Sequence, residues 1–234
     1  MVELIRGLDA AHITANLAAV RANIDEALAA SQLARAPGGE AVEVLAAVKY
    51  VASEELGTLA EAGVELVGEN RAQDLVEKAG SHPGLFEWDF IGQLQSRRVK
   101  LIVPHVRLIH SVASQSVLRE LERHRAAARP GLELLLEVNV AGEEGKAGIA
   151  PREIGDYIEA APFPVSGLMT MPPLTERAEE SRRWFAALRE LAVEHGLTRL
   201  SMGTSQDYPV AVEEGATIVP VSYTHLTLPT NREV

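Results

Sequence analysis

A lysine at the end of an apolar segment is the residue best placed for chemistry in this chain. Residues 41–48 read Ala-Val-Glu-Val-Leu-Ala-Ala-Val, and Lys49 follows them directly. Such a nearly continuous apolar run is typical of a strand buried on both faces of a parallel sheet. Two interpretations of Lys49 stay open: its ammonium lies in water above apolar neighbours, or its amine faces a pocket and reacts with a carbonyl group.

A second group of candidate residues lies near the other end of the sequence, in the run Ser-Met-Gly-Thr-Ser. Here Gly203 would let a ligand approach the backbone, and a helix starting at Ser205 would direct its amide groups toward an anion. The alternative is an ordinary strand-to-helix turn. Together with Lys49, the segment from Ser201 to Ser205 predicts a ligand with both an aldehyde and a phosphate, for which pyridoxal phosphate is the obvious candidate.

Alternating strand and helix patterns predict how these residues meet. About eight strand-helix units in this length favour a single-domain (β/α)8 TIM barrel of the α/β class, with an open doubly wound sheet as the alternative. The carboxyl ends of barrel strands form one rim, which Lys49 and the Ser201 segment would share. Thr175 and Ser205 are predicted helix caps. The predicted strands span 41–48, 64–67, 88–91, 108–111, 133–138, 165–169, 197–201 and 216–219, and the predicted helices span 9–34, 53–62, 69–79, 95–102, 114–128, 151–160, 175–195 and 205–214.

Composition and charge exclude several classes of protein. The 33 acidic and 22 basic residues give a net charge of −11, which opposes binding to nucleic acid and to anionic membranes. The chain has no cysteine, no apolar run long enough to span a bilayer and no signal-peptide pattern. We therefore expect a cytoplasmic protein without disulfides or thiolate metal sites.

Other polar residues receive simpler interpretations. The histidines show no metal-ligand spacing, so we assign no metal. His110 is interpreted as a strand-end histidine whose ring nitrogens are hydrogen-bonded, although it could also reach the rim. Glu143, Glu144 and Lys146 are interpreted as parts of a solvated loop.

Seven runs, in one order along the chain, resemble the pyridoxal phosphate homeostasis proteins, also called alanine racemase N-terminal-like proteins. The resemblance covers about residues 9–219. The runs are LAAVKY at 45–50, VGENRAQDLVEK at 67–78, WDFIGQLQSRRVK at 88–100, IHSVAS at 109–114, VNVAGEEGKAGI at 138–149, GLMTM at 167–171 and LSMGTSQDY at 200–208.

The resemblance implies a fold-type III barrel over residues 1–219 that carries pyridoxal phosphate as a Schiff base on Lys49. It also implies that Asn70 lies beside the cofactor ring and that Ser201, Gly203 and Ser205 belong to the phosphate-binding segment. The implied function is intracellular pyridoxal phosphate homeostasis without robust catalytic turnover, and therefore without catalytic residues. The implied protein is a monomer, with apo forms of pyridoxal phosphate-dependent enzymes as partners. A small racemase or lyase using the same cofactor is the alternative, although racemisation needs an acid and a base on opposite faces of the cofactor.

The chain departs from the family pattern after residue 219. Where the family continues with an arginine and, two residues later, a glycine, this chain has Pro220 and Ser222. The resemblance then implies the loss of two cofactor contacts, and a cofactor-impaired variant is a further alternative. The segment from Val221 also resembles a peptide that recurs at the ends of unrelated translated sequences, so we interpret residues 220–234 as a foreign tail. The competing interpretation is a divergent terminus in which Ser222 or Thr224 supplies the phosphate donors.

Overall fold

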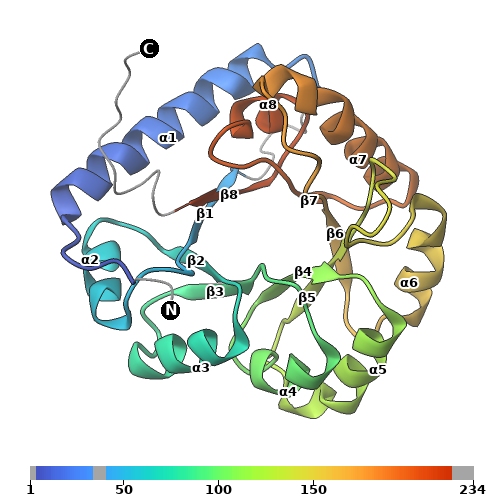
Figure 1. The fold of residues 1–234 in the computed structure, drawn as a ribbon, viewed down its shortest axis with the longest axis horizontal. Helices are drawn as coiled ribbons and strands as arrows, with labels where there is room; N and C mark the ends of the chain where they lie inside the picture. Colours follow the sequence, from blue (N-terminus) through green and yellow to red (C-terminus); the bar gives the residue numbers. More distant parts are fainter. Residues whose placement is uncertain (1–3, 34–40, 223–234) are drawn as a thin grey trace.

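A closed barrel of parallel strands forms the centre of the computed structural model, which describes residues 4–33 and 41–222. In this described part of the chain eight strands pair in sequence order, and the last strand, β8, pairs with the first, β1 (Figure 1). Helices surround the barrel on its outside (Figure 1). The predicted single-domain (β/α)8 TIM barrel is confirmed.

The strands and helices alternate along the chain. The strands are β1 (Glu43–Ala47), β2 (Leu66–Glu69), β3 (Glu87–Phe90), β4 (Leu108–Val112), β5 (Glu133–Glu137), β6 (Val165–Met169), β7 (Arg199–Ser201) and β8 (Ile218–Ser222). The α-helices are α1 (Ala10–Ala30), α2 (Leu56–Glu61), α3 (Ala72–Ser81), α4 (Val99–Ile102), α5 (Gln115–Arg123), α6 (Ile154–Ala160), α7 (Arg182–Glu194) and α8 (Tyr208–Glu213). None of the helices in the described ranges has the length and apolar character needed to cross a bilayer.

Helix α1 follows the predicted pattern of apolar residues. Ile13, Leu17, Val20 and Ile24 are buried in the apolar layer between the strands and the surrounding helices. The predicted cap at Thr175 is wrong. Its hydroxyl bonds to the carbonyl of Arg177 at 3.0 Å, and α7 begins only at Arg182, after a short 3₁₀ turn. Local bonds of this kind between a side chain and the backbone compete with helix formation.

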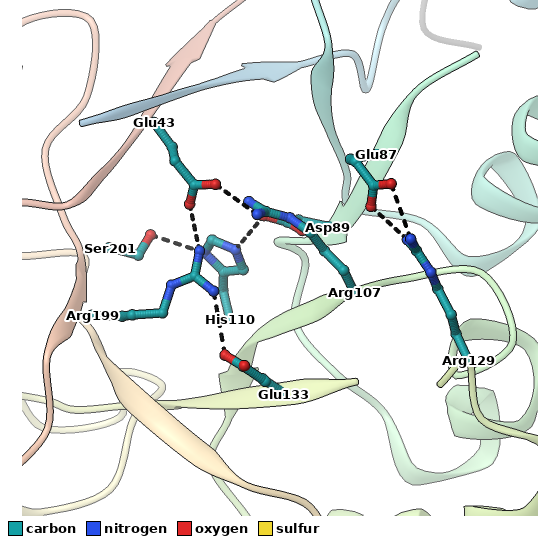
Figure 2. Close-up of polar contacts among 9 residues, drawn as sticks. All are labelled: Glu43, Glu87, Asp89, Arg107, His110, Arg129, Glu133, Arg199 and Ser201. Carbon is teal, nitrogen blue, oxygen red and sulfur yellow. Dashed lines mark hydrogen bonds and ion pairs between the residues drawn. The ribbon is translucent and has the colours of Figure 1, made fainter. Parts of the chain in front are cut away.

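The amino end of the barrel interior is filled by charged side chains. Arg107 bonds to Glu43 at 2.6 Å and to Asp89 at 3.0 Å, while Arg199 bonds to Glu43 and, at 3.3 Å, to Glu133 (Figure 2). Burial alone would lower the pKa of Arg107, but its hydrogen bonds to Glu43 and Asp89 outweigh burial and raise the pKa. The guanidinium therefore stays charged inside the barrel.

An apolar layer lies on the same interior faces of the strands. Its members are Leu45, Leu66, Leu108, Leu135, Met169 and Ile218. Side chains at alternate positions of a barrel strand point inward. From the amino end to the carboxyl end of the strands, these inward side chains form first the charged cluster, then the apolar layer and then the rim. The interior is thus packed with side chains below the rim.

A buried ion pair joins helix α3 to the rim. Lys78 and Glu69 are almost fully buried, and their side chains meet at 2.7 Å. The Lys78 ammonium also donates to the Val48 carbonyl at 2.7 Å. Glu69 in turn accepts the backbone N–H of Asn70 at 2.7 Å. One pair of charges therefore fixes the backbone beside Lys49, which follows Val48, and the backbone of Asn70.

Removing one member of this pair should be strongly destabilising. We expect Lys78→Met to lower the free energy of unfolding by about 3–5 kcal/mol, because it leaves the Glu69 carboxylate buried without its charged partner. The double variant Glu69→Gln/Lys78→Met should recover part of that loss. Urea denaturation followed by circular dichroism measures both values. The control is Arg123→Met in the exposed pair with Glu120, where about 0–1 kcal/mol is expected; an equally small loss for Lys78→Met would contradict the assignment.

Strand β8 crosses the predicted domain boundary. It runs to Ser222 and pairs with β1 through Leu45 opposite Pro220 and Ala47 opposite Ser222. The boundary predicted at residue 219 therefore falls inside a barrel strand. Residues 223–234, including Thr224, lie outside the described residues, and the interpretation of residues 220–234 as a foreign tail stays a prediction.

Candidate functional site

A cavity of about 490 Å³ opens among the loops at the carboxyl ends of the strands. Its wall includes Lys49, Ser201, Gly203 and Ser205, so the structure brings these predicted site residues together. Asn70 is not among the residues of the wall. The convergence of an amine and several hydroxyl groups at one rim is the arrangement expected of a ligand site in a barrel.

Lys49 lies in the turn that follows β1. The preceding residue, Val48, still belongs to the ladder, since its N–H donates to the Gly68 carbonyl of β2 at 2.9 Å. The Lys49 ammonium lies 5.2 Å from the centroid of the Tyr50 ring, a cation-π contact. Within the described ranges no carboxylate forms an ion pair with Lys49. The half-buried lysine therefore lies at the cavity wall with its ammonium against the Tyr50 ring.

Asn70 follows β2 and carries an unsatisfied polar atom. Its Oδ1 is buried and has no hydrogen-bond partner in the described part of the chain. Gly92 lies directly against it, because a Cβ at residue 92 would stand 2.1 Å from the Asn70 carbonyl oxygen. Only glycine fits there. Buried polar atoms without partners are uncommon, and an amide next to the rim with a free acceptor matches a residue that contacts a ligand.

The loop from Ser201 to Ser205 differs from the prediction in one respect. Helix α8 begins at Tyr208 and not at Ser205. The reason is Asp207, whose carboxylate accepts the N–H of Thr204 at 2.7 Å and its hydroxyl at 2.9 Å. The predicted helix start at Ser205 is therefore three residues too early, and the anion site predicted at this loop stays a prediction. Ser205 instead accepts the N–H of Ser222 at 3.1 Å and keeps its own hydroxyl proton for donation to a ligand.

Gly203 has a conformational reason to be glycine. Its φ is +90°, and a Cβ there would stand 2.8 Å from the Cβ of Ala211 on α8. The loop can therefore lie flat against the helix while facing the cavity on its other side.

Ser201 makes a buried contact that the sequence did not reveal. Its hydroxyl lies 2.9 Å from Nδ1 of His110, and Nε2 of His110 lies 3.1 Å from Asp89 (Figure 2). All three residues are buried, and both Ser201 and His110 contribute to the cavity wall. The interpretation of His110 as a histidine with both ring nitrogens bonded is confirmed. The signal that could have found this chain of contacts is an aspartate between the apolar residues Trp88 and Phe90 of strand β3.

Sequence reasoning missed one role of Lys146. The loop is solvated, as predicted, with Glu144 exposed, but the side chain of Lys146 also lines the cavity, paired with Glu143. Glycines 142, 145 and 148 all have positive φ, which lets the loop after β5 turn back over the rim. The glycines spaced around Lys146 were the sequence signal that could have predicted this turn of the loop toward the rim.

The wall as a whole fits a ligand with an apolar ring, a carbonyl group and an anionic group. Met169, Met171 and Leu174 supply an apolar side, Lys49 supplies the amine, and Ser205 supplies a hydroxyl donor. The described residues contain no cluster of histidine and acidic side chains that could hold a metal ion. Pyridoxal phosphate has the three features that this wall accommodates.

Comparison with known proteins agrees with this geometry. The family described as alanine racemase, N-terminal domain, matches residues 8–218. The "Pyridoxal phosphate homeostasis protein" of Aquifex aeolicus is 39% identical over 195 residues, which cover 79% of this chain and 86% of that protein. The chain belongs to this family of pyridoxal phosphate homeostasis proteins.

Solved structures of related proteins share the fold. PipY of Synechococcus elongatus, whose structure was solved with pyridoxal phosphate bound, is 30% identical, with a TM-score of 0.74 over 92% of this chain and 100% of PipY. Alanine racemase of Bartonella henselae has a TM-score of 0.67 over 93% of this chain and 59% of the racemase, but at 12% identity the likeness shows the fold alone. The barrel fold therefore occurs both as nearly the whole of a chain and as part of a longer one.

One carboxyl group near the rim has a shifted pKa. Leu135 belongs to the interior apolar layer, and Glu137 lies on the same face of β5 two residues further toward the rim. Burial raises the pKa of Glu137, and the positive charge of Lys146 offsets part of this rise. The carboxyl therefore binds a proton more tightly in the folded chain than in the unfolded chain.

This shift should appear as a pH dependence of stability. A raised folded pKa gives stability that is present in acid and is lost as the pH rises through the folded pKa. We expect Glu137→Gln to unfold with a larger free energy than the wild type at about pH 7, and the difference to shrink toward about pH 4. Urea denaturation across this range measures it. Glu144→Gln removes the same charge from an exposed loop position and is the control; identical pH profiles for both variants would refute the prediction.

Proposed function

We propose that this protein binds pyridoxal phosphate and holds it covalently on Lys49, as a carrier in intracellular pyridoxal phosphate homeostasis without robust catalytic turnover. The observation that carries the proposal is the convergence of Lys49, Ser205 and an apolar wall on one cavity at the carboxyl rim. The relatives support it, because they are named as pyridoxal phosphate homeostasis proteins and include a structure with this cofactor bound.

Lys49, Asn70 and the loop from Ser201 to Ser205 have separate tasks in this proposal. When bound, pyridoxal phosphate supplies an aldehyde carbon that an uncharged amine attacks. Lys49 provides the nitrogen at the end of β1. Ser205 donates its hydroxyl to the phosphate, with Gly203 allowing close approach of the backbone and Ser201 lying at the start of the same loop. Asn70 lies outside the wall as the structure has it, and its role beside the cofactor ring rests on its buried amide oxygen, which has no partner among the described residues.

The remaining parts of the proposal concern the setting in which the protein works. We place it in the cytoplasm, as a monomer that transfers the cofactor to apo forms of pyridoxal phosphate-dependent enzymes. The absence of cysteine and the acidic net charge of −11 support a reducing compartment and a lack of affinity for nucleic acid.

Replacement of the lysine tests the covalent attachment. We expect Lys49→Ala to abolish the visible absorbance of the bound cofactor and the adduct that borohydride reduction fixes on the chain, because the other amine in the cavity wall, that of Lys146, is paired with Glu143. Mass spectrometry of the reduced protein, after digestion, locates the adduct. Lys100→Ala, at an exposed position, is the matched control and should retain both signals. A full adduct on the Lys49→Ala protein would show that the assignment is wrong.

The departure at residue 220 can be tested by restoring the family residue. Pro220 lines the cavity, and the resemblance to the family implies that an arginine at this position would face the cofactor ring. We expect Pro220→Arg to tighten pyridoxal phosphate binding by about tenfold, the effect of one hydrogen bond to a charged group. Equilibrium dialysis measures the affinity. Pro220→Ala separates the loss of proline from the gain of a guanidinium, and equal affinities for the two variants would contradict the expected contact.

A further inference from the structure

The turn that carries Lys49 is fixed by hydrogen bonds of the residue before it. The Val48 carbonyl accepts the N–H of Val51 at 3.0 Å, so Lys49 is the first of the two central residues of a four-residue turn. The N–H of Val48 donates to the Gly68 carbonyl of β2 at 2.9 Å. The peptide group between Val48 and Lys49 therefore determines the point at which the lysine side chain leaves the backbone.

Lys78 of helix α3 supplies a second donor to the same carbonyl. Its ammonium donates to the Val48 oxygen at 2.7 Å and to Glu69 at 2.7 Å. Glu69 is itself fixed, because its other carboxylate oxygen accepts the N–H of Asn70 at 2.7 Å. The side chains of Lys78 and Glu69 are 6% and 0% exposed, so water does not compete for these bonds. A charge-assisted hydrogen bond thus ties the peptide before Lys49 to a helix on the outside of the barrel (Figure 1).

Stability alone does not account for this ion pair. Replacement of a buried pair by apolar side chains of similar volume is often neutral or stabilising, because removal of two charges from water costs about as much as their attraction gains. Leu75, one turn before Lys78 on α3, is such a buried apolar side chain. An apolar residue at position 78 would pack equally well, but it would lack the donor to the Val48 carbonyl.

We propose that Lys78 is a positioning residue for the covalent attachment of pyridoxal phosphate: held by Glu69, it fixes the peptide from which the Lys49 side chain reaches the aldehyde. This inference rests on the proposed function. In the attachment the Lys49 nitrogen forms a double bond to the aldehyde carbon, and the aldehyde oxygen leaves as water with both protons of the uncharged amine. Lys78 neither gives nor takes a proton in this step. It limits the positions of the amine, and loss of such positioning slows a reaction between two bound groups.

The double variant Glu69→Gln/Lys78→Met tests this role. Its glutamine can still accept the Asn70 N–H, and no buried charge is left unpaired, so the variant specifically lacks the bond to the Val48 carbonyl. Attachment is followed at several pyridoxal phosphate concentrations by borohydride reduction at set times and mass spectrometry. We expect the limiting rate at saturating cofactor to fall by about tenfold or more. The half-saturating concentration should not change, because the loop from Ser201 to Ser205 is not altered.

Formaldehyde separates the position of the amine from its intrinsic reactivity. This aldehyde is too small for the cavity to orient, so its reaction with Lys49 in the protein without ligand depends on the exposure and basicity of the amine. We expect formaldehyde and cyanoborohydride to methylate Lys49 at rates within about twofold of each other in the wild type and the double variant. Lys100, exposed on α4, is the internal reference for labelling.

Leu121→Ala is the control for a general loss of stability. Leu121 is fully buried on α5, which α4 separates from α3 around the barrel (Figure 1). Its truncation leaves a cavity and should destabilise the fold strongly, yet the limiting rate of attachment should stay that of the wild type. Urea denaturation shows that both variants are folded under the conditions of the assay.

The outcomes distinguish this inference from the proposed function. A folded double variant with the wild-type limiting rate, or one in which only the half-saturating concentration changes, overturns the positioning role and leaves the carrier function standing. An equal loss in attachment and in methylation also overturns it, because the amine itself would then have changed. An equal loss of attachment rate in Leu121→Ala does the same. A wild-type protein that yields no adduct at Lys49 overturns both proposals.

Discussion

The buried carboxylate of Asp89 is the interaction on which the barrel interior depends. It has no exposed surface, and it receives Arg107 from the amino end and His110 from the carboxyl end. An ion of this kind inside a protein is tolerated only when its partners replace the water it has lost. The same carboxylate therefore joins two regions that would otherwise be independent: the charged end that closes the barrel and the polar floor of the cavity. A substitution in the charged cluster or in the floor of the cavity therefore changes the surroundings of the same carboxylate, that of Asp89.

The architecture was predictable because its signals are local. Continuous apolar runs such as residues 41–48 identify buried parallel strands, and the spacing of Ile13, Leu17, Val20 and Ile24 identifies the inner face of α1. These patterns result from burial, which the fold requires at every strand and helix. The start of α8 was missed because a single side chain, Asp207, bonds back to Thr204 and moves the first helical turn along the chain. Whether a side chain bonds to the backbone in this way, and so delays the start of a helix, depends on geometry that residue types alone do not specify.

The candidate site was predictable at its strand ends and not in its interior. Lys49, Ser201, Gly203 and Ser205 could be placed at one rim because the carboxyl ends of barrel strands must meet there. The contact between Ser201 and His110 joins residues 91 positions apart in the sequence. No pattern in a single sequence states which inward polar side chains touch, because that depends on the register and twist of the closed barrel. The pairing of Lys78 with Glu69 was hidden for the same reason.

The order of strands around the barrel determines at which stage of synthesis and folding the cavity can form. Strand β8 lies between β1 and β7, and it contributes Pro220 and Ser222 to the wall. During synthesis the strand that precedes Lys49 leaves the ribosome well before β8, and until β8 arrives the sheet is open along that seam. Until then the loop after β1 lacks the part of the wall that β8 supplies. The cavity beside Lys49 can therefore close around a ligand only after β8 has paired with both of its neighbours.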